Sequence, residues 1–516
     1  MGIGSRALVA YLVTAAVLAG CGSSGATSTG ATSSDASAAD ALASDGAGAA
    51  LDSGEGGLAP DALSDTSLDA GDTDTGSGPD VSGVTADGGP SSVAYPLKAS
   101  ANGRYLVDQN GHPFLMAGDA PQSLVVNVSE SDADRYFADR KAHGFNSVWI
   151  NLICNTYTAG RSDGTTYDGL APFTTPGDLS TPNDAYFTRA DHMMRLAAKY
   201  DLNVLLDPAE TGGWLSVLTA NGVTKDRAYG QYVGNRYKSF DNIVWMSGND
   251  FQSWRTARDD AAASAVALGI KDVDTRHIHT VELDYNTSSS SDDPTWVPII
   301  FLDAAYTYSP TYAQVLKSYN RASPLPVFLV EGVYEFESNA QAHQATTATL
   351  RRQEYWTNLS GATGQLYGSH YTWTFTSGWQ GMLDSPGATQ MPYLDALFGP
   401  RAWYALVPDQ DHSVVTSGYG TSTATGHVDD SDYLTAARTP DGALGMAYMP
   451  TSRAIAVDMA KLRGPAKAQW YDPSRGVYTT IAGSPLLNMG THSFTPPGPN
   501  GDGDGDGDWV LVLEAP

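Results

Sequence analysis

Two acidic residues, Asp250 and Glu331, each follow a short apolar run of the kind that forms a buried strand. Such a pair can cleave an acetal, because one carboxylic acid protonates the leaving oxygen while the other carboxylate attacks the carbon. A carboxylate beside a buried strand is costly unless it has such a role. The structural alternative for Asp250 is that it caps the helix that follows it. We take the two residues as the candidate catalytic pair.

Eight apolar runs can supply the strands that position this pair, and helical patterns follow most of them. The runs are Phe114–Gly118, Ser147–Ile153, Asn203–Asp207, Ile243–Ser247, His277–Leu283, Ile299–Ala304, Val327–Val330 and Gln365–Tyr371. This alternation predicts an α/β fold, a (β/α)8 TIM barrel. An open doubly wound sheet is the alternative, but it usually has fewer strands, and no Gly-rich phosphate loop follows the first run.

In a (β/α)8 barrel the functional groups project from the C-terminal ends of the strands. Strands four and seven lie on opposite sides of an eight-membered ring, so Asp250 and Glu331 should face each other across its mouth. Polar and aromatic residues at other strand ends are candidate substrate-binding residues, because aromatic faces stack on sugar rings. They are Asp119, Asn151, Asn249, Tyr306, Tyr308, His370 and Trp373.

Several of these assignments keep an alternative. Asp119 could be a structural hydrogen-bond acceptor, and His370 and Trp373 could belong to the core. Either Tyr306 or Tyr308 could hydrogen-bond the nucleophile. The two acidic residues after Glu331 in the same connection, Glu335 and Glu337, are expected to be solvated. The long connection Asn155–Asp178, which carries Tyr157, Tyr167 and Phe173, is expected at the active-site face.

Other chemistries are not supported by the sequence. There is no Lys at the strand ends for a Schiff base, and the His-Glu-x-x-His and Gly-x-Ser-x-Gly motifs are absent. His277-x-His279 has metal-ligand spacing, but metal-dependent barrels usually carry such a pair on the first strand. The run Asp502–Asp508 resembles the start of a calcium loop, yet its twelfth position is Leu513 and not Glu. Cys154 is predicted to be a buried apolar residue. We predict no metal and no cofactor.

The N-terminus has the features of an export signal. Arg6 precedes the apolar stretch Ala7–Ala19, which is too short for a membrane span. Leu18-Ala19-Gly20-Cys21 resembles a bacterial lipobox, which implies cleavage before Cys21 and lipidation of its thiol; the alternative is a chance Cys after a cleavable signal. The resemblance implies a protein of the bacterial cell envelope, lipid-anchored on the outer membrane or cell surface, or else secreted.

The chain carries 57 acidic and 29 basic residues, a formal net charge of -28, which argues against a nucleic-acid-binding surface. Twelve of those acids lie between Cys21 and Ala94, in a stretch of mostly Gly, Ala, Ser, Thr and Asp with no Lys or Arg. Such a stretch cannot bury enough apolar area to order itself. We predict a signal over 1–21, a disordered tether over 22–95 and a barrel over 96–405.

After Pro408 the pattern changes to short strands separated by Pro, Gly and Asp turns, such as Pro440-Asp441-Gly442. This pattern predicts a small antiparallel β-sandwich over 406–516. The domain resembles the collagen-binding domain of a collagenase, a likeness carried by Ala468–Pro473 and Asp508–Leu513.

The order of the candidate pair resembles the retaining glycosidase clan, in which the acid/base follows strand four after an Asn, the nucleophile follows strand seven, and a Trp ends strand eight. A narrower resemblance, to the apiosidase-like glycoside hydrolase family, covers almost the whole folded chain. It is carried by Asn102–Asp108, Gly111–Phe114, Gly118–Asp119, Asp134–Phe137, Gly144–Asn146, Val244–Asp250 and Pro326–Glu331. That family uses Asp as the acid/base, so it implies that Asp250 is the acid/base and Glu331 the nucleophile.

The sequence therefore predicts a monomeric retaining glycoside hydrolase that acts on polysaccharides or oligosaccharides. The resemblance implies an apiose-containing pectin as the substrate. The alternative is a non-catalytic surface lipoprotein that binds carbohydrate or collagen through a degenerate barrel. A protease, which the collagenase likeness would suggest, lacks any visible zinc motif or serine triad.

Overall fold

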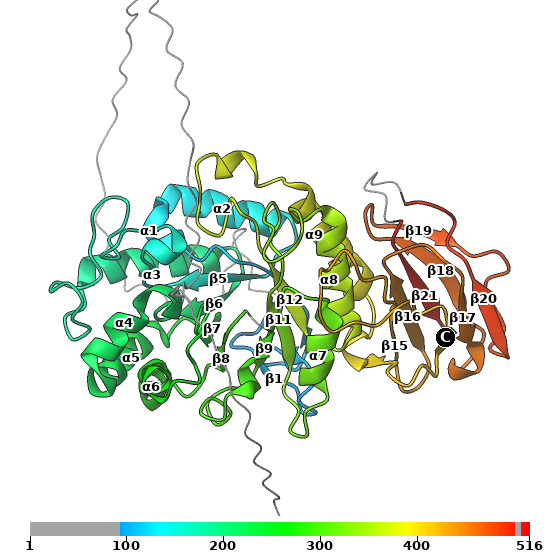
Figure 1. Cartoon of the computed structure of the whole chain (residues 1–516), viewed down its shortest axis with the longest axis horizontal. Helices are drawn as coiled ribbons and strands as arrows, with labels where there is room; N and C mark the ends of the chain where they lie inside the picture. Colours follow the sequence, from blue (N-terminus) through cyan, green and yellow to red (C-terminus); the bar gives the residue numbers. More distant parts are fainter. Residues whose placement is uncertain (1–92, 286, 501–506) are drawn as a thin grey trace, which may run out of the picture. The chain divides into compact units, whose positions relative to one another are not determined.

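The computed structural model describes residues 93–285, 287–500 and 507–516 (Figure 1). The predicted lipidation of Cys21 and nearly all of the predicted tether lie outside the described residues, and both stay predictions. Mass spectrometry of the mature N-terminus would decide the lipidation. Among the described residues, no helix combines the length and the apolar character that crossing a bilayer requires.

Eight parallel strands form the first domain, and they confirm the predicted (β/α)8 barrel (Figure 1). They are β4 (Met116–Asp119), β5 (Ser147–Asn151), β6 (Asn203–Asp207), β7 (Ile243–Ser247), β8 (His279–Val281), β10 (Asp303–Tyr306), β11 (Val327–Glu331) and β12 (Gly364–Tyr367). The last strand, β12, pairs in parallel with the first, β4. This pairing joins the last strand to the first, as in a barrel, and excludes the open doubly wound sheet.

One seam of the barrel departs from the regular pattern. The sheet order runs β8-β7-β6-β5-β4-β12-β11-β10-β9, so β8 and β10 are not paired as strands. Instead β9 (Ser288–Ser289) lies antiparallel beside β10. The connection between β8 and β10 contains a short 3-10 helix (Ser290–Asp292) and no α-helix in its described residues. The sixth barrel strand, β10, begins at Asp303 and so starts later than predicted. The N–H groups of Ile299 and Ile300 instead donate to the carbonyl of Trp296 and form a turn before this strand.

Helices cover the outside of the strands, as Figure 1 shows. They are α1 (Leu124–Asn127), α2 (Glu130–Ala142), α3 (Asp184–Lys199), α4 (Thr211–Asn221), α5 (Val223–Tyr237), α6 (Ala257–Val273), α7 (Thr311–Tyr319), α8 (Thr347–Leu359) and α9 (Pro386–Phe398). Ser129 caps α2, since its hydroxyl accepts from the Asp132 N–H at 3.0 Å. Asn183 caps α3, since its side chain accepts from the N–H of Ala185.

Large apolar side chains fill the interior of the barrel. Trp149, Leu205, Met246 and Phe328 come from four different strands and are fully buried in one cluster. A small sheet of β1 (Lys98–Ala99), β2 (Leu106–Val107) and β3 (Pro113–Phe114) adds Leu106 and Phe114 to this cluster. The interior is therefore a packed core, and polar chemistry is left to the strand ends.

Asp119, at the end of β4, forms a buried ion pair with Arg140 of α2. The Arg140 guanidinium donates to Asp119 Oδ2 at 3.1 Å, and the Tyr136 hydroxyl donates to the same oxygen at 2.5 Å. Both charged side chains are almost completely excluded from solvent. Removing one partner of such a pair leaves the other charge uncompensated, which is far more costly than losing a surface pair.

We therefore expect Arg140→Met to lower the free energy of unfolding by about 3–5 kcal/mol. Urea denaturation followed by far-UV circular dichroism measures this change. Arg135→Met, on the exposed face of the same helix, is the matched control and should change stability little. A loss in Arg140→Met no larger than in that control would contradict a net stabilising ion pair.

The second domain consists of two antiparallel sheets and confirms the predicted β-sandwich. The larger sheet contains β13 (Val407–Pro408), β15 (Thr435–Arg438), β16 (Leu444–Met449), β21 (Trp509–Glu514), β18 (Lys467–Asp472) and β19 (Val477–Thr480), in that order. The smaller sheet contains β14 (Val415–Ser417), β17 (Ile455–Asp458) and β20 (Thr491–Phe494).

The Asp502–Asp508 run falls mostly on residues that lie outside the described part. Its last member, Asp508, is buried and accepts two hydrogen bonds from the Arg351 guanidinium, at 2.9 and 3.0 Å. Asp508 also receives the Tyr448 hydroxyl at 3.1 Å. This carboxylate is a structural anchor between α8 and β21, not part of a solvated acidic loop.

Candidate active site

The two predicted catalytic carboxyls lie side by side at the C-terminal ends of their strands. The Tyr306 hydroxyl is 2.8 Å from Asp250 Oδ1 and 2.7 Å from Glu331 Oε1. These two oxygens are therefore at most about 5.5 Å apart, close enough for both carboxyls to act on one glycosidic bond. The fold thus brings together two predicted carboxyls that lie 81 positions apart in the chain.

Three phenols surround Glu331, the last residue of β11. Its Oε1 accepts from Tyr306 at 2.7 Å and from Tyr308 at 2.5 Å, and its Oε2 accepts from Tyr334 at 2.8 Å. The choice that the sequence left open between Tyr306 and Tyr308 is resolved, because both contact Glu331. Burial and the nearby Asp250 carboxyl raise the pKa of Glu331, and the phenol donors oppose this shift.

Asp250 lies just after β7 and is held by two phenols, those of Tyr306 and Tyr157. The Tyr157 hydroxyl donates to Asp250 Oδ2. Burial raises the pKa of Asp250, although both phenol hydrogen bonds oppose the shift. Tyr157 belongs to the long connection that was predicted to be functional, but its pairing with Asp250 spans 93 residues and leaves no local sequence signal. Tyr334 was likewise missed by the sequence analysis.

Asn249 contacts the site through a chain of hydrogen bonds. Its amide donates to Gln122 Oε1 at 2.9 Å, and the Gln122 amide donates to the Tyr334 hydroxyl at 3.1 Å. That hydroxyl donates in turn to Glu331. Gln122, which follows β4, was not predicted, and it joins the segments after strands four and seven.

Asp119 and Asn151 are directed into the scaffold, so the structural alternative holds for Asp119. Asp119 has no exposed surface, and its carboxylate accepts hydrogen bonds from Arg140 and Tyr136. Asn151 accepts from the Trp149 indole at 2.8 Å and donates to Glu210 at 3.3 Å, and it is also fully buried. Neither side chain hydrogen-bonds Asp250 or Glu331 among the described residues, and their role in substrate binding stays a prediction.

Glu210 positions the connection that carries Tyr157. It accepts from the Asn155 N–H at 2.7 Å and from the Thr158 hydroxyl at 2.8 Å, on either side of Tyr157. Burial raises the pKa of Glu210 to about 7. A carboxyl just after β6 thus supports the loop beside the site.

His370 and Trp373 share one acceptor, Glu337. Glu337 Oε1 accepts from the Trp373 indole at 2.8 Å and lies 3.1 Å from His370 Nδ1. The His370 side chain is 45% exposed, which leaves it accessible to a ligand. The expectation that Glu335 is solvated is wrong. It is buried, and it accepts from the Ser385 hydroxyl at 2.6 Å and from the Gly387 N–H at 2.7 Å.

Cys154 and the pair His277 and His279 have the contacts of structural residues. Cys154 is fully buried, as predicted, and burial raises the pKa of its thiol. His277 Nδ1 lies 2.7 Å from Asp274 Oδ2. His279 stacks on Trp245, and burial lowers its pKa to about 3.

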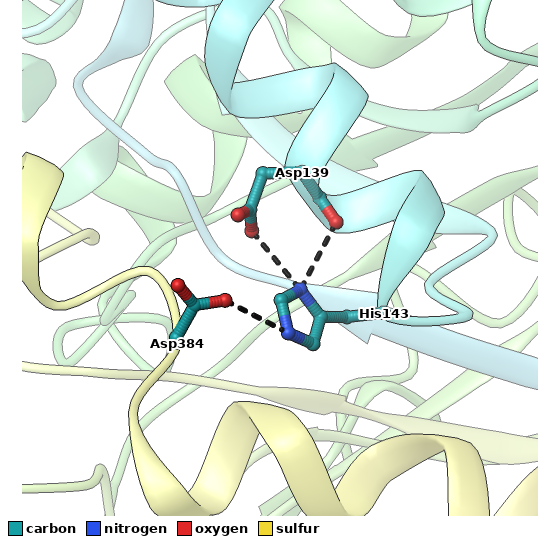
Figure 2. Close-up of side chains that lie close together, drawn as sticks. All are labelled: Asp139, His143 and Asp384. Atoms are coloured by element: carbon teal, nitrogen blue, oxygen red, sulfur yellow. Dashed lines mark hydrogen bonds and ion pairs between the residues drawn. The ribbon is translucent and has the colours of Figure 1, made fainter.

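Figure 2 shows the one group of three described side chains whose ligand atoms are close enough for a metal ion: Asp139, His143 and Asp384. His143 lies between the two carboxylates, at 3.2 Å from each. Asp139 is already paired with Arg140, and the Asp384 side chain is 81% exposed. The three residues form an ion-pair cluster on the outer surface of α2, and nothing at this cluster points to a ligand.

Solved structures of glycoside hydrolases share this two-domain fold. One, described as a glycoside hydrolase, has a TM-score of 0.70 and 23% identity and covers 82% of this chain and 97% of its own. A glycoside hydrolase family 5 protein from Bacteroides vulgatus ATCC 8482 has a TM-score of 0.69 and 20% identity, with coverages of 81% and 93%. At these identities the likeness establishes the fold. No curated protein matches the chain significantly.

The fold and the paired carboxyls place the chain in the class of glycoside hydrolases. Residues 100–405 match the family described as "Apiosidase-like, catalytic domain", and because this match spans more than half of the chain, the protein belongs to that family. The family predicted from the sequence motifs is confirmed. Residues 411–514 match the family described as "Putative collagen-binding domain of a collagenase".

Proposed function

We propose that the protein is a retaining glycoside hydrolase in which Asp250 is the acid/base and Glu331 the nucleophile. The observation that carries the proposal is the single phenol, Tyr306, that lies within hydrogen-bond distance of both carboxyls and so bounds their separation. The alternative of a degenerate, non-catalytic barrel is not favoured, because both carboxyls and their phenol donors are in place.

The reaction requires one proton on the pair. Two carboxyls this close to each other disfavour double ionisation. Tyr306 has a single O–H and can donate to only one of the two carboxyls, whereas Tyr308 and Tyr334 donate to Glu331 alone and Tyr157 donates to Asp250 alone. Hydrogen bonds to a charged form stabilise that form, so the two donors that only Glu331 has favour its ionised state. We therefore assign the negative charge to Glu331 and the proton to Asp250.

In the first step Glu331 attacks the anomeric carbon while Asp250 donates its proton to the glycosidic oxygen. The bond from carbon to that oxygen breaks, and the alcohol leaves. In the second step Asp250, now a carboxylate, takes a proton from water as the water attacks the anomeric carbon. The bond to Glu331 breaks, and the carboxyl pair returns to its starting charge.

The remaining polar groups suit a carbohydrate ligand. We assign His370 and Trp373 to substrate binding, because Glu337 fixes both and His370 is accessible. Asn249 is assigned to a sugar hydroxyl near the anomeric carbon, by its place directly before Asp250. The family likeness makes an apiose-bearing glycan the first substrate to test, within a wider screen of plant and bacterial polysaccharides.

Proton NMR of a running digest tests the mechanism. With a substrate identified by the screen, the first anomer released should have the configuration of the bond that was cleaved, because two displacements restore it. Mutarotation then produces the other anomer slowly. Initial release of the opposite anomer would show a single displacement and exclude Glu331 as a covalent nucleophile.

A further inference from the structure

A third carboxyl, that of Glu282, touches the backbone of the acid/base. Glu282 directly follows β8 and is only 1% exposed. Its Oε2 accepts the N–H of Asp250 at 2.9 Å, while its own N–H donates to the carbonyl of Ser247 at 2.8 Å. Glu282 Oε1 is buried and has no hydrogen-bond partner among the described residues. None of the catalytic steps uses this side chain.

The segment that Glu282 holds has an unusual backbone. Gly248, Asn249 and Asp250 have φ values of 114°, 67° and 51°. Two consecutive non-glycine residues with positive φ are disfavoured, so the surrounding contacts must maintain this conformation. The close approach of Glu282 also explains the glycine, since a Cβ at Gly248 would lie 2.1 Å from the Glu282 carbonyl oxygen.

We propose that Glu282 is a positioning residue that keeps Asp250 in this left-handed conformation, with its carboxyl between Tyr157 and Tyr306. The inference rests on the proposed role of Asp250 as the acid/base. The Asp250 N–H is the only direct side-chain contact between Glu282 and the catalytic pair that the described residues show. Misplacing Asp250 would therefore be the main consequence of losing Glu282.

Glu282 fits this role best as an uncharged acid. Burial raises its pKa well above the usual range, and the charges of Glu331, Asp250 and Asp207 add to the shift. A neutral carboxyl can still accept the Asp250 N–H, and it adds no third negative charge beside the pair. Glutamine has the shape of a protonated glutamic acid and retains an acceptor oxygen.

Two substitutions at Glu282 separate the acceptor from the charge. Glu282→Gln keeps the hydrogen bond and should retain kcat within about threefold, because it loses no positioning contact. Glu282→Met removes the acceptor and should lower kcat on the natural glycan by about 10²-fold, the effect of a misplaced catalytic group. KM should change little. Thermal melting checks that both variants fold.

The dependence on the leaving group distinguishes positioning of the acid from a general structural role. An aryl glycoside with an acidic phenol needs little protonation, so its kcat/KM should fall far less in Glu282→Met than that of the glycan. In the background of Asp250→Ala, Glu282→Met should cause no further loss, because the group that it positions is absent.

Several outcomes would overturn the inference. They are equal losses on both substrates, a further loss in the double variant, and a loss above about tenfold in the isosteric Glu282→Gln. If Glu282→Met does not fold, the turnover of Glu282→Gln alone decides whether the inference stands. An inactive Asp250→Ala together with a fully active Glu282→Met rejects only this inference, whereas an active Asp250→Ala rejects the proposed function itself.

Discussion

Glu331→Gln is expected to lower turnover by about 10⁴-fold or more, because an amide cannot form the covalent bond to the anomeric carbon. The phenols on one side of residue 331 can still donate to the amide oxygen, and a phenol oxygen on the other side can accept from the amide N–H2, so the fold should be preserved. The measurement is kcat on the glycan identified by screening. Because the substitution changes chemistry more than binding, KM should change much less than kcat.

Two further observations make the Glu331 prediction specific. Glu130→Gln, an exposed change on α2, is the control and should leave turnover unchanged. A fluorinated sugar analogue that slows the second step should label Glu331 in the native protein, and mass spectrometry of the labelled peptide would locate the bond. Substantial turnover by Glu331→Gln, or a label on another residue, would remove Glu331 from the nucleophile role.

Asp250→Ala is expected to lower turnover of the glycan by about 10²–10⁴-fold, the contribution of a positioned general acid. With an activated aryl glycoside the first step needs little acid catalysis, so the loss should be smaller, and the covalent intermediate should accumulate. Added azide needs no general base, so it should restore turnover and yield a glycosyl azide of retained configuration. The azide product is measured by NMR.

The pH profile provides a second measurement on the same variant. Burial raises the pKa of Asp250, so the native protein keeps its acid proton to a higher pH than an exposed Asp does, and loses activity as the pH rises beyond that pKa. This alkaline limb of kcat/KM should disappear in Asp250→Ala. Asp241→Ala, a change at an exposed aspartate, is the control. An unchanged alkaline limb, or no rescue by azide, would contradict the assignment of Asp250.

The sequence by itself determined the barrel and the sandwich, and it named the candidate carboxyl pair. Apolar runs spaced along the chain give strand positions, because a strand buried on both faces needs nearly continuous apolar residues. Strand order places the fourth and seventh strands three positions apart in the eight-membered ring, and the resemblance to the retaining clan then singled out Asp250 and Glu331. The family motifs around these residues supported the same choice.

Only the tertiary structure decided which other polar residues belong to the site. Asp119 and Asn151 end their strands as Asp250 and Glu331 do, yet they are directed into the scaffold, toward Arg140 and Glu210. Side-chain direction depends on the local backbone and on partners from distant elements, and a one-dimensional pattern contains neither.

The same reason explains the residues that the sequence did not reveal. Tyr157, Tyr334 and Gln122 reach the carboxyls through hydrogen bonds that mostly join separate elements. Glu282 contacts the backbone of Asp250 only because that segment adopts positive φ values, which its non-glycine residues do not predict. Local periodicity therefore located the two carboxyls, whereas the contacts that set their charge and orientation arise only when distant segments meet in the folded chain.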